Sequence, residues 1–342
     1  MNKKKVKFGI LVFIVVSILL LSLVANVFLA PNVFTKGNED VYLLVYENTT
    51  FDELVDQLTE KTRVKKINTF KQTARAMKFT NVKSGRYKIV NSMNNITVVR
   101  MLRNGNQTPV QLTFNNIRTK EQLASRLSQQ LMPDSTEILL LLNDTAFLSK
   151  YGVNPYTSVS LFLPNTYEMF WNVKAERIFE RMHREYEKFW NDERKQKAAA
   201  IPLSQDQVST LASIVDSESN VVSEKPIIAG LYLNRLKKNM PLQADPTVIF
   251  AVGDFSIRRV LHEHLRIESP YNTYRNTGLP PGPIRIPTLS GLDAVLNFDK
   301  NDYIFMCAKE TLNGEHNFAA TWAEHRINAA KYQKALNERG IR

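Results

Sequence analysis

An uncharged, largely apolar run at residues 8–30 constrains this chain most, because it is long enough to form one membrane-spanning helix of roughly 20 residues. The seven residues before it include four lysines, which predict a cytoplasmic amino terminus by the positive-inside rule. We therefore expect a cytoplasmic tail at 1–7 and a transmembrane helix at 8–30. The protein would be a single-pass protein of the cell (inner) membrane, with residues 31–342 outside the cytoplasm.

A cleaved signal peptide is the alternative for this segment. Ala25 and Ala30 are small residues that would permit cleavage, but no clear small-x-small site precedes Pro31. The length of the run and its β-branched, leucine-rich middle also favour a retained anchor.

The charge of the chain limits the classes of partner. The formal net charge is +12, and only four of the lysines belong to the tail, so the exported part is basic as well. A basic surface can bind nucleic acid, but a tethered domain outside the cytoplasm has little access to it. We therefore expect no nucleic acid and favour an anionic wall polymer or the membrane surface, with ordinary solubilising lysines as the alternative.

Cysteine and histidine usage argues against disulfide and metal frameworks. Cys307 is the single cysteine, lies in the apolar run 303–308 and is expected in a strand, so no internal disulfide is possible. His262 and His264 would share one face of a strand, but no third ligand of matching spacing stands near them. We expect no metal and no cofactor.

The exported part divides by pattern into three regions. Residues 38–114 combine short strands with short helices, one opened by a capping box at Thr50 and Glu53, which predicts a small α+β module. Residues 115–200 are expected to be a mostly helical connecting region that ends in one long amphipathic helix over about 175–197. Its aromatic residues are expected to pack in a core. Residues 201–342 carry the polar motifs described next and are expected to mix helices and strands.

One carboxylate in the third region stands out. Ser204 and Gln207 form a capping box that predicts a helix start, and the following apolar residues form one stripe. Glu218 falls on the edge of that stripe, whereas Asp216 falls off the opposite edge and farther out. Partial desolvation would raise the pKa of Glu218 and suit it to general-acid work near neutral pH. A helix-end glutamate that is solvated or salt-bridged is the alternative.

Several polar, turn-rich stretches follow Glu218. Residues 242–247 lie next to a proline, where a regular helix is not expected. Residues 269–274 and 278–284 form a rigid loop with two tyrosines, which suits sugar rings and hydroxyls. Residues 314–318 and the pair at 324–325, which we place in a helical tail, supply further polar groups. Each stretch taken separately is only a loop.

Taken together and in order, these stretches resemble the YceG-like, or MltG, family of endolytic murein transglycosylases. The matching motifs are LFLPNTY (161–167), ASIVDSE (212–218), NRL (234–236), LQADPTV (242–248), SPYNTY (269–274), GLPPGPI (278–284), G-x-H-x-F (314–318) and EH (324–325). The resemblance implies an α+β fold with a LysM-like module at 38–114 and a mixed α/β catalytic domain at 201–342. Departures from the family pattern are Asp216 for a glutamate, Asn165 for an aspartate, Ile286 for an asparagine and Phe298 for a proline.

The resemblance also implies a reaction. A lyase of this family cuts the peptidoglycan glycan strand between N-acetylmuramic acid and N-acetylglucosamine without water, leaves 1,6-anhydro ends and limits the length of nascent strands. Peptidoglycan synthases would be plausible partners. A hydrolytic muramidase and a non-catalytic, peptidoglycan-binding scaffold of the wall-synthesis machinery are the alternatives.

Site residues follow from the matched motifs. Glu218 would be the catalytic acid, and Asp245 and Glu324 would orient it or bind substrate. The remaining candidates would hold the sugars or line the cleft: Gln243, Tyr271, Asn272, Tyr274 and His316.

Overall fold

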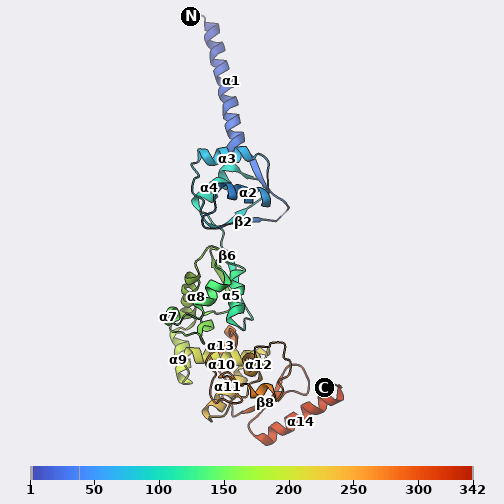
Figure 1. Cartoon of the computed structure of the whole chain (residues 1–342). Coiled ribbons are helices and arrows are strands. Elements are labelled where there is room, and N and C mark those ends of the chain that lie inside the picture. Colours follow the sequence, from blue (N-terminus) through green and yellow to red (C-terminus); the bar gives the residue numbers. More distant parts are fainter. Residues whose placement is uncertain (1–2, 38, 341–342) are drawn as a thin grey trace. The chain divides into compact units, whose positions relative to one another are not determined.

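The computed structural model describes residues 3–37 and 39–340 and divides into two compact units (Figure 1). The N-terminal unit comprises residues 1–112, 130–132 and 167–173, and the C-terminal unit comprises residues 113–129, 133–166 and 174–342. The predicted connecting region thus contributes to both units. Five residues of the predicted regions lie outside the described part: Met1, Asn2, Asn38, Ile341 and Arg342.

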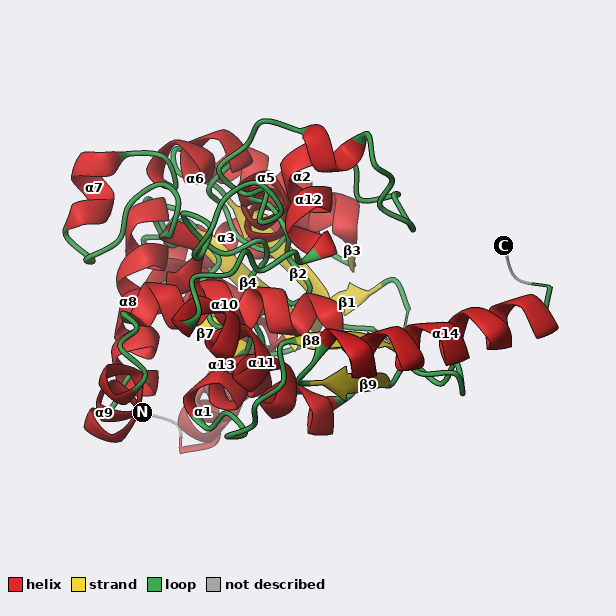
Figure 2. Cartoon of the chain, turned by 90° about the horizontal axis from the view of Figure 1, so that it is seen from below, coloured by secondary structure: helices red, strands yellow, loops and turns green. Residues whose placement is uncertain are grey.

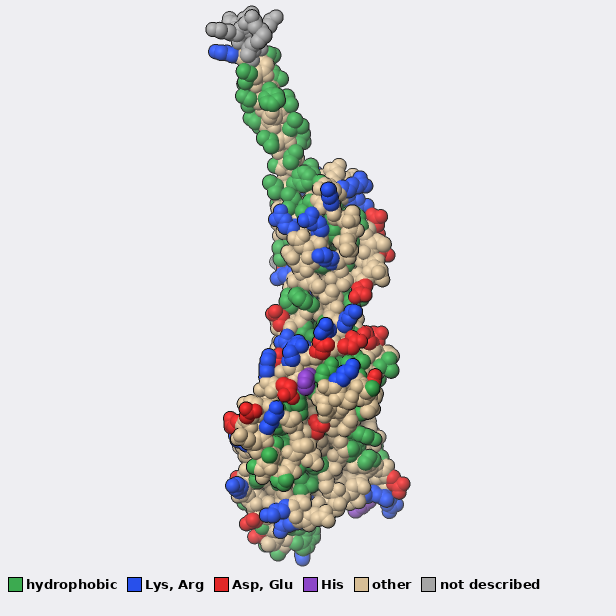
Figure 3. Space-filling view, turned by 90° about the vertical axis from the view of Figure 1, so that its left-hand side faces the viewer, with side chains coloured by type: hydrophobic (Ala, Val, Ile, Leu, Met, Phe, Trp, Pro, Cys, Tyr) green, Lys and Arg blue, Asp and Glu red, His purple; other side chains and the backbone are tan. Residues whose placement is uncertain are grey.

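A single apolar helix opens the N-terminal unit. Helix α1 (Lys3–Phe28) contains 26 residues, about 39 Å at 1.5 Å per residue, and its apolar stretch over Lys7–Phe28 has a mean hydropathy of 3.0. Figure 3 shows hydrophobic side chains along its visible face. By length and composition α1 can cross a membrane, which suggests membrane anchoring.

The rest of the N-terminal unit is a small α+β module. Its elements after α1 are β1 (Pro31–Thr35), β2 (Val41–Val45), α2 (Phe51–Lys61), β3 (Thr62–Val64), α3 (Ile67–Ala76), β4 (Gly85–Ile89), β5 (Met93–Asn94), α4 (Asn95–Asn104), β6 (Val110–Thr113) and β7 (Thr166–Met169). Strand β1 lies between β3 and β5 and is antiparallel to both, and β2 pairs antiparallel with β4. The capping box predicted at Thr50 and Glu53 opens α2 as expected.

The module begins earlier than residue 38, the start that the sequence pattern predicts. Strand β1 follows α1 after two residues, and its Asn32 is buried. The Asn32 amide donates to Asn95 Oδ1 at 2.7 Å, and the Asn95 amide donates to the Val27 carbonyl at 2.8 Å. These bonds join the last turn of α1 to the first turn of α4, so the apolar helix runs directly into the folded module.

The C-terminal unit is mainly helical with one β-hairpin. Its elements are α5 (Lys120–Ser128), α6 (Ser135–Leu141), α7 (Thr145–Ser149), η1 (Ser158–Leu161), α8 (Ala175–Phe189), α9 (Asp192–Ala200), α10 (Gln205–Glu218), η2 (Val222–Glu224), α11 (Lys225–Lys237), α12 (Asp245–Val252), η3 (His264–Arg266), α13 (Leu289–Leu296), β8 (Phe305–Ala308), β9 (His316–Ala319) and α14 (Trp322–Glu338). Helix α10 packs against α11, α12 and α13, and α14 runs beside the antiparallel β8–β9 hairpin (Figure 2). The α+β class is confirmed, and Cys307 lies in β8 as expected.

Two helix predictions for this unit are wrong. The single helix predicted over 175–197 is two helices, because the backbone of the fully buried Trp190 leaves the helical region and Asn191 caps α9 by accepting from the Arg194 N–H. Residues 242–247 were expected to be non-helical, yet α12 starts at Asp245. Pro246 occupies its first turn, where a missing N–H costs nothing.

His262 and His264 do not lie on a strand, in which they would have shared one face. His262 lies in a loop and His264 begins the single turn η3. The His264 ring accepts the Leu261 N–H at 3.0 Å, so local turn formation takes the place of strand alternation.

Candidate active site

A pocket of about 290 Å³ in the C-terminal unit contains the carboxylate on which the sequence argument centres. The pocket draws on α10, α11, α12, the hairpin strands and the loops between them. Its lining residues are Glu218, Leu231, Tyr232, Arg235, Leu242, Gln243, Asp245, Tyr274, Met306, Cys307, Ala308 and His316.

Glu218 is the last residue of α10, and its carboxyl group is desolvated and hydrogen-bonded in the pocket. The Tyr232 hydroxyl donates to its Oε1 at 2.6 Å. The pKa of Glu218 is raised from its usual 4.5 to about 7, mainly by burial, and the negative charge of Asp245 acts in the same direction. The Tyr232 hydrogen bond and the positive charges of His316 and Arg235 act in the opposite direction. A carboxyl group with a pKa near 7 can give up and take back a proton at neutral pH.

Helix α10 is more completely buried than its sequence pattern predicts. The capping box at Ser204 and Gln207 is present, as predicted. However, every residue from Val208 to Asp216 is buried, so the helix has no exposed face along this stretch. Asp216, expected on the outer edge of the helix, is only 4% exposed.

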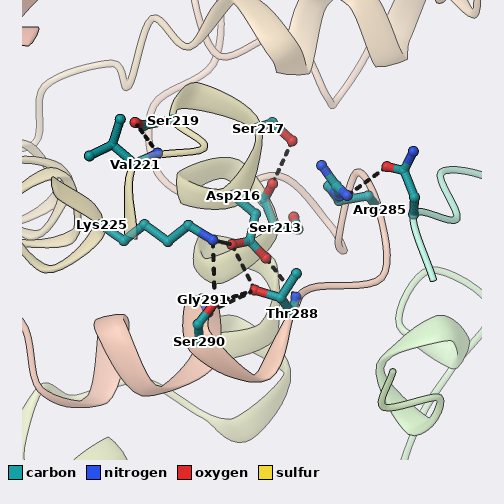
Figure 4. A network of polar contacts seen from close by, with 11 residues as sticks. Ser213, Asp216, Ser217, Ser219, Val221, Lys225, Arg285, Thr288, Ser290 and Gly291 are labelled. Carbon is teal, nitrogen blue, oxygen red and sulfur yellow. Dashed lines mark hydrogen bonds and ion pairs between the residues drawn. The ribbon is translucent and has the colours of Figure 1, made fainter. Parts of the chain in front are cut away.

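The burial of Asp216 is explained by a network of polar contacts (Figure 4). Its carboxylate pairs with Lys225 Nζ at 2.6 Å and accepts the Thr288 N–H at 2.6 Å. Lys225 is the first residue of α11 and Thr288 is the N-cap of α13, so the network joins the ends of three helices. A Cβ on Gly291 would lie 2.5 Å from the Asp216 oxygens, which explains why glycine suits this close approach. The network fixes the end of α10, two residues before Glu218.

A buried carboxylate holds His316, a lining residue of the pocket. Glu224 is buried, accepts the backbone N–H of His316 at 2.7 Å, and lies 3.0 Å from His316 Nδ1. The Ser219 hydroxyl donates to Glu224 at 3.1 Å. With Nδ1 engaged, Nε2 is the His316 ring nitrogen available to a ligand in the pocket. Glu224 has no sequence signal for this contact, because 92 residues separate it from His316 and no local pattern links them.

The remaining wall combines a tyrosine–aspartate pair with an arginine. The Tyr274 hydroxyl donates to Asp245 Oδ1 at 2.5 Å. Arg235 donates to the carbonyls of Leu242 and Ile304, each at 2.7 Å, and so links the loop that carries Gln243 to the hairpin. Burial lowers the pKa of Arg235. Its charge remains beside Glu218 and Tyr232.

The structure brings five of the predicted site residues together and places the other three elsewhere. Tyr271 packs against Phe250, with ring centres 4.7 Å apart, outside this pocket. Asn272 is buried and donates to the carbonyls of Leu265 and Ile267 at 2.9 Å each, which organises its loop. Glu324 is exposed and closes the capping box of α14.

Across residues 3–37 and 39–340, no group of three or more His, Cys, Asp or Glu side chains is placed to hold a metal ion.

A Tyr232→Phe variant tests the link between Tyr232 and the acidity of Glu218. The tyrosine hydrogen bond lowers the pKa of Glu218, so its loss is expected to raise that pKa further above about 7. If Glu218 acts as the protonated acid, the alkaline limb of the pH–rate profile moves to higher pH. An unchanged limb in measured kcat/KM between pH 5 and 9 would contradict this.

Comparison with known proteins identifies the family to which the chain belongs. A family model described as the YceG-like family matches residues 43–331. The endolytic murein transglycosylase of Bacillus subtilis is 44% identical over 137 residues, 40% of this chain and 37% of that protein. The protein of the same name from Streptococcus pneumoniae R6 is 26% identical over 321 residues, 84% of this chain and 57% of that protein. The chain thus spans between about a third and three fifths of these relatives.

A solved structure also resembles the chain. The crystal structure of a yceG-like protein from Listeria monocytogenes matches with a TM-score of 0.57 and 26% sequence identity. The match covers 85% of this chain and 99% of that structure.

Proposed function

Because the chain belongs to the YceG-like family, we propose that it is an endolytic murein transglycosylase that cuts peptidoglycan glycan strands. The observation that carries the proposal is Glu218, a carboxyl group with a pKa of about 7 in a polar pocket. The two relatives described above carry that name, which supports the same reaction class. The bond cut would be the one between N-acetylmuramic acid and N-acetylglucosamine.

In the proposed mechanism, Glu218 acts twice. As an acid it protonates the glycosidic oxygen while the bond from that oxygen to muramic C1 breaks. The muramic C6 hydroxyl then forms a new bond to C1, and Glu218, now a carboxylate, takes the hydroxyl proton. Glu218 is thereby restored, no water is consumed, and the product ends in 1,6-anhydro-muramic acid.

The other pocket residues would bind and orient the sugars. Asp245 and Tyr274 present a hydrogen-bonded pair in the same pocket as Glu218, and Gln243 lines that pocket too. His316, fixed through Nδ1 by Glu224, would offer Nε2 to a sugar hydroxyl. This arrangement suits directional hydrogen bonds to a carbohydrate.

A hydrolytic muramidase is the second candidate, and Asp245 is the observation that favours it. A glycosidase needs two carboxyl groups, one as acid and one as nucleophile or base, and Asp245 lines the same pocket as Glu218. The tyrosine bond to Asp245 instead supports a fixed, substrate-binding role, because it occupies one of the carboxylate oxygens.

The N-terminal unit would place this activity at the membrane. The apolar helix α1 is followed directly by the module, so the catalytic unit would act on strands near their site of synthesis. We assign the chain to the cell (inner) membrane, with its amino-terminal tail in the cytoplasm. We also propose that the module is LysM-like and that peptidoglycan synthases are partners. These assignments rest on the lysines before the apolar run and on the family resemblance.

A Glu224→Gln variant tests the function proposed for the buried pair of Glu224 and His316. The amide cannot hold His316 as the carboxylate does, so His316 is expected to lose its fixed orientation. We expect kcat/KM on glycan strands to fall by roughly tenfold, the worth of one charge-assisted hydrogen bond. A variant that loses its thermal stability along with its activity would mean that Glu224 only supports the fold.

The length of the products tests the endolytic activity directly. Purified uncrosslinked glycan strands are incubated with the full chain in detergent and separated by length. Internal cleavage predicts an early shift to strands of intermediate length. Release of disaccharides from intact long strands would mean that cutting begins at an end.

A further inference from the structure

A second pocket, of about 360 Å³, adjoins the candidate active site within the C-terminal unit. Ser217 lines this pocket, whereas the next residue, Glu218, lines the candidate active site. In the same way, Asp245 lines the site and Pro246 lines the second pocket. Consecutive Cα atoms are about 3.8 Å apart. The two pockets therefore lie on either side of a wall formed by the end of α10 and the start of α12.

Two arginines give the second pocket its chemistry, and we call it the Arg118–Arg285 pocket. One Nη of Arg285 donates to Asn116 at 2.8 Å, while its Nε is buried without a hydrogen-bond partner among the described residues. The guanidinium of Arg118 lies 5.0 Å from the ring centre of Phe255. In the described part of the chain, neither arginine forms an ion pair, so the pocket contains unused donors for an anion.

The charges around the pocket favour an anionic ligand. Burial lowers the pKa of Arg285, the charge of Asp216 opposes this, and the positive charge of Arg118 lowers the pKa further. Asp216 is itself matched by Lys225 at 2.6 Å, which leaves the two guanidinium groups in excess. An anion bound between the arginines would relieve their mutual repulsion.

The rest of the lining adds apolar surface. The aromatic and aliphatic side chains involved are Phe250, Phe255, Ile249, Ile257 and Ile284. A ligand that satisfies both parts of the pocket has carboxylates separated by small apolar groups. A short acidic peptide has this composition.

We propose that the Arg118–Arg285 pocket binds the peptide stem of the muramic acid residue whose glycosidic bond is cut. This inference rests on the proposed function. The stem begins on the sugar that would occupy the adjacent site, and it carries free carboxylates and alanine methyl groups. The planar guanidinium forks pair with those carboxylates, and the apolar wall contacts the methyl groups. The pocket makes the enzyme prefer strands that retain their stems.

The test compares two substrates with the full chain in detergent. Uncrosslinked glycan strands with intact stems are compared with the same strands after an amidase has removed the stems. We measure kcat/KM for the wild type, Arg118→Gln, Arg285→Gln and the control Arg326→Gln. Arg326 is exposed on α14 and lines neither pocket.

The wild type is expected to cut stem-bearing strands faster than stripped strands. The kcat/KM of each pocket variant should fall roughly tenfold on stem-bearing strands, which is the effect of losing one charge-assisted hydrogen bond. On stripped strands it should stay within twofold of the wild-type value. The control should match the wild type on both. Because Arg118 is exposed, its variant is expected to fold even if Arg285→Gln does not.

Other outcomes overturn the proposal in distinguishable ways. Equal losses on both substrates would mean that the arginines support the fold or the whole site. Unchanged rates for the variants, or a wild type with no preference for stems, would mean that the pocket does not bind them. A wild type that cuts neither substrate would refute the proposed function itself, and the stem proposal with it.

Discussion

Glu218→Gln is expected to lower the rate of glycan cleavage by roughly 10²- to 10⁴-fold, because the amide cannot donate or accept the proton that the reaction requires. The substitution is nearly isosteric, and the amide oxygen can still accept the Tyr232 hydroxyl that now bonds to Oε1. Binding of glycan strands should therefore persist. The measurement is kcat and KM on uncrosslinked strands, with binding followed separately by co-sedimentation.

The pH dependence of stability distinguishes loss of proton transfer in Glu218→Gln from unfolding of the variant. Glu218 has a folded-state pKa of about 7, above its usual 4.5, so the folded protein holds a proton that the unfolded chain releases. Its contribution to stability is therefore lost as pH rises from about 4.5 to 7. Glutamine does not titrate, so the variant should gain thermal stability relative to wild type between pH 5 and pH 8. Full activity in a folded variant would remove Glu218 from the mechanism.

The largest effect on stability is expected from breaking the buried pair of Asp216 and Lys225. Lys225→Met leaves the Asp216 carboxylate buried with only Thr288 as a donor among the partners described above, and such uncompensated charges cost about 3–5 kcal/mol. The unfolding transition of the C-terminal unit should move down by several degrees in calorimetry. Activity should fall with it, because this network fixes the end of α10.

A surface pair provides the matched control. Lys197 pairs with Glu193 at 2.7 Å on the exposed side of α9, and Lys197→Met should cost less than about 1 kcal/mol. The double variant Asp216→Asn/Lys225→Met should recover part of the loss, because no lone charge remains. Equal destabilisation by the buried and the exposed substitution would contradict the function we give to the network.

The sequence predicted local structure well where the signals were local. The capping boxes at Ser204 and Thr50 begin helices α10 and α2 where predicted, because a cap depends on residues only three positions apart. The apolar run at the amino terminus is one helix. The split between α8 and α9 at Trp190 was missed, because tertiary burial of one side chain overrode an amphipathic pattern that continues through it.

The candidate site was predictable in its centre and not in its walls. Glu218, Asp245, Tyr274, Gln243 and His316 meet in one pocket, as the order of motifs suggested. The partners that fix them could not be read from spacing. Glu224 meets His316 across 92 residues, and Asp216 meets Thr288 across 72 residues. Glu324 lies outside this pocket and closes the capping box of α14, a role that its sequence position also fits.

Mass spectrometry of products formed in water enriched in ¹⁸O, with Glu218→Gln beside the wild type, separates the lyase from the hydrolase. The transglycosylase mechanism predicts 1,6-anhydro-muramic ends without heavy oxygen, formed by the wild type and lost in the variant. Ordinary reducing ends that carry ¹⁸O would show that water is the nucleophile. That result would contradict the transglycosylase mechanism and point to Asp245 as the second carboxyl group.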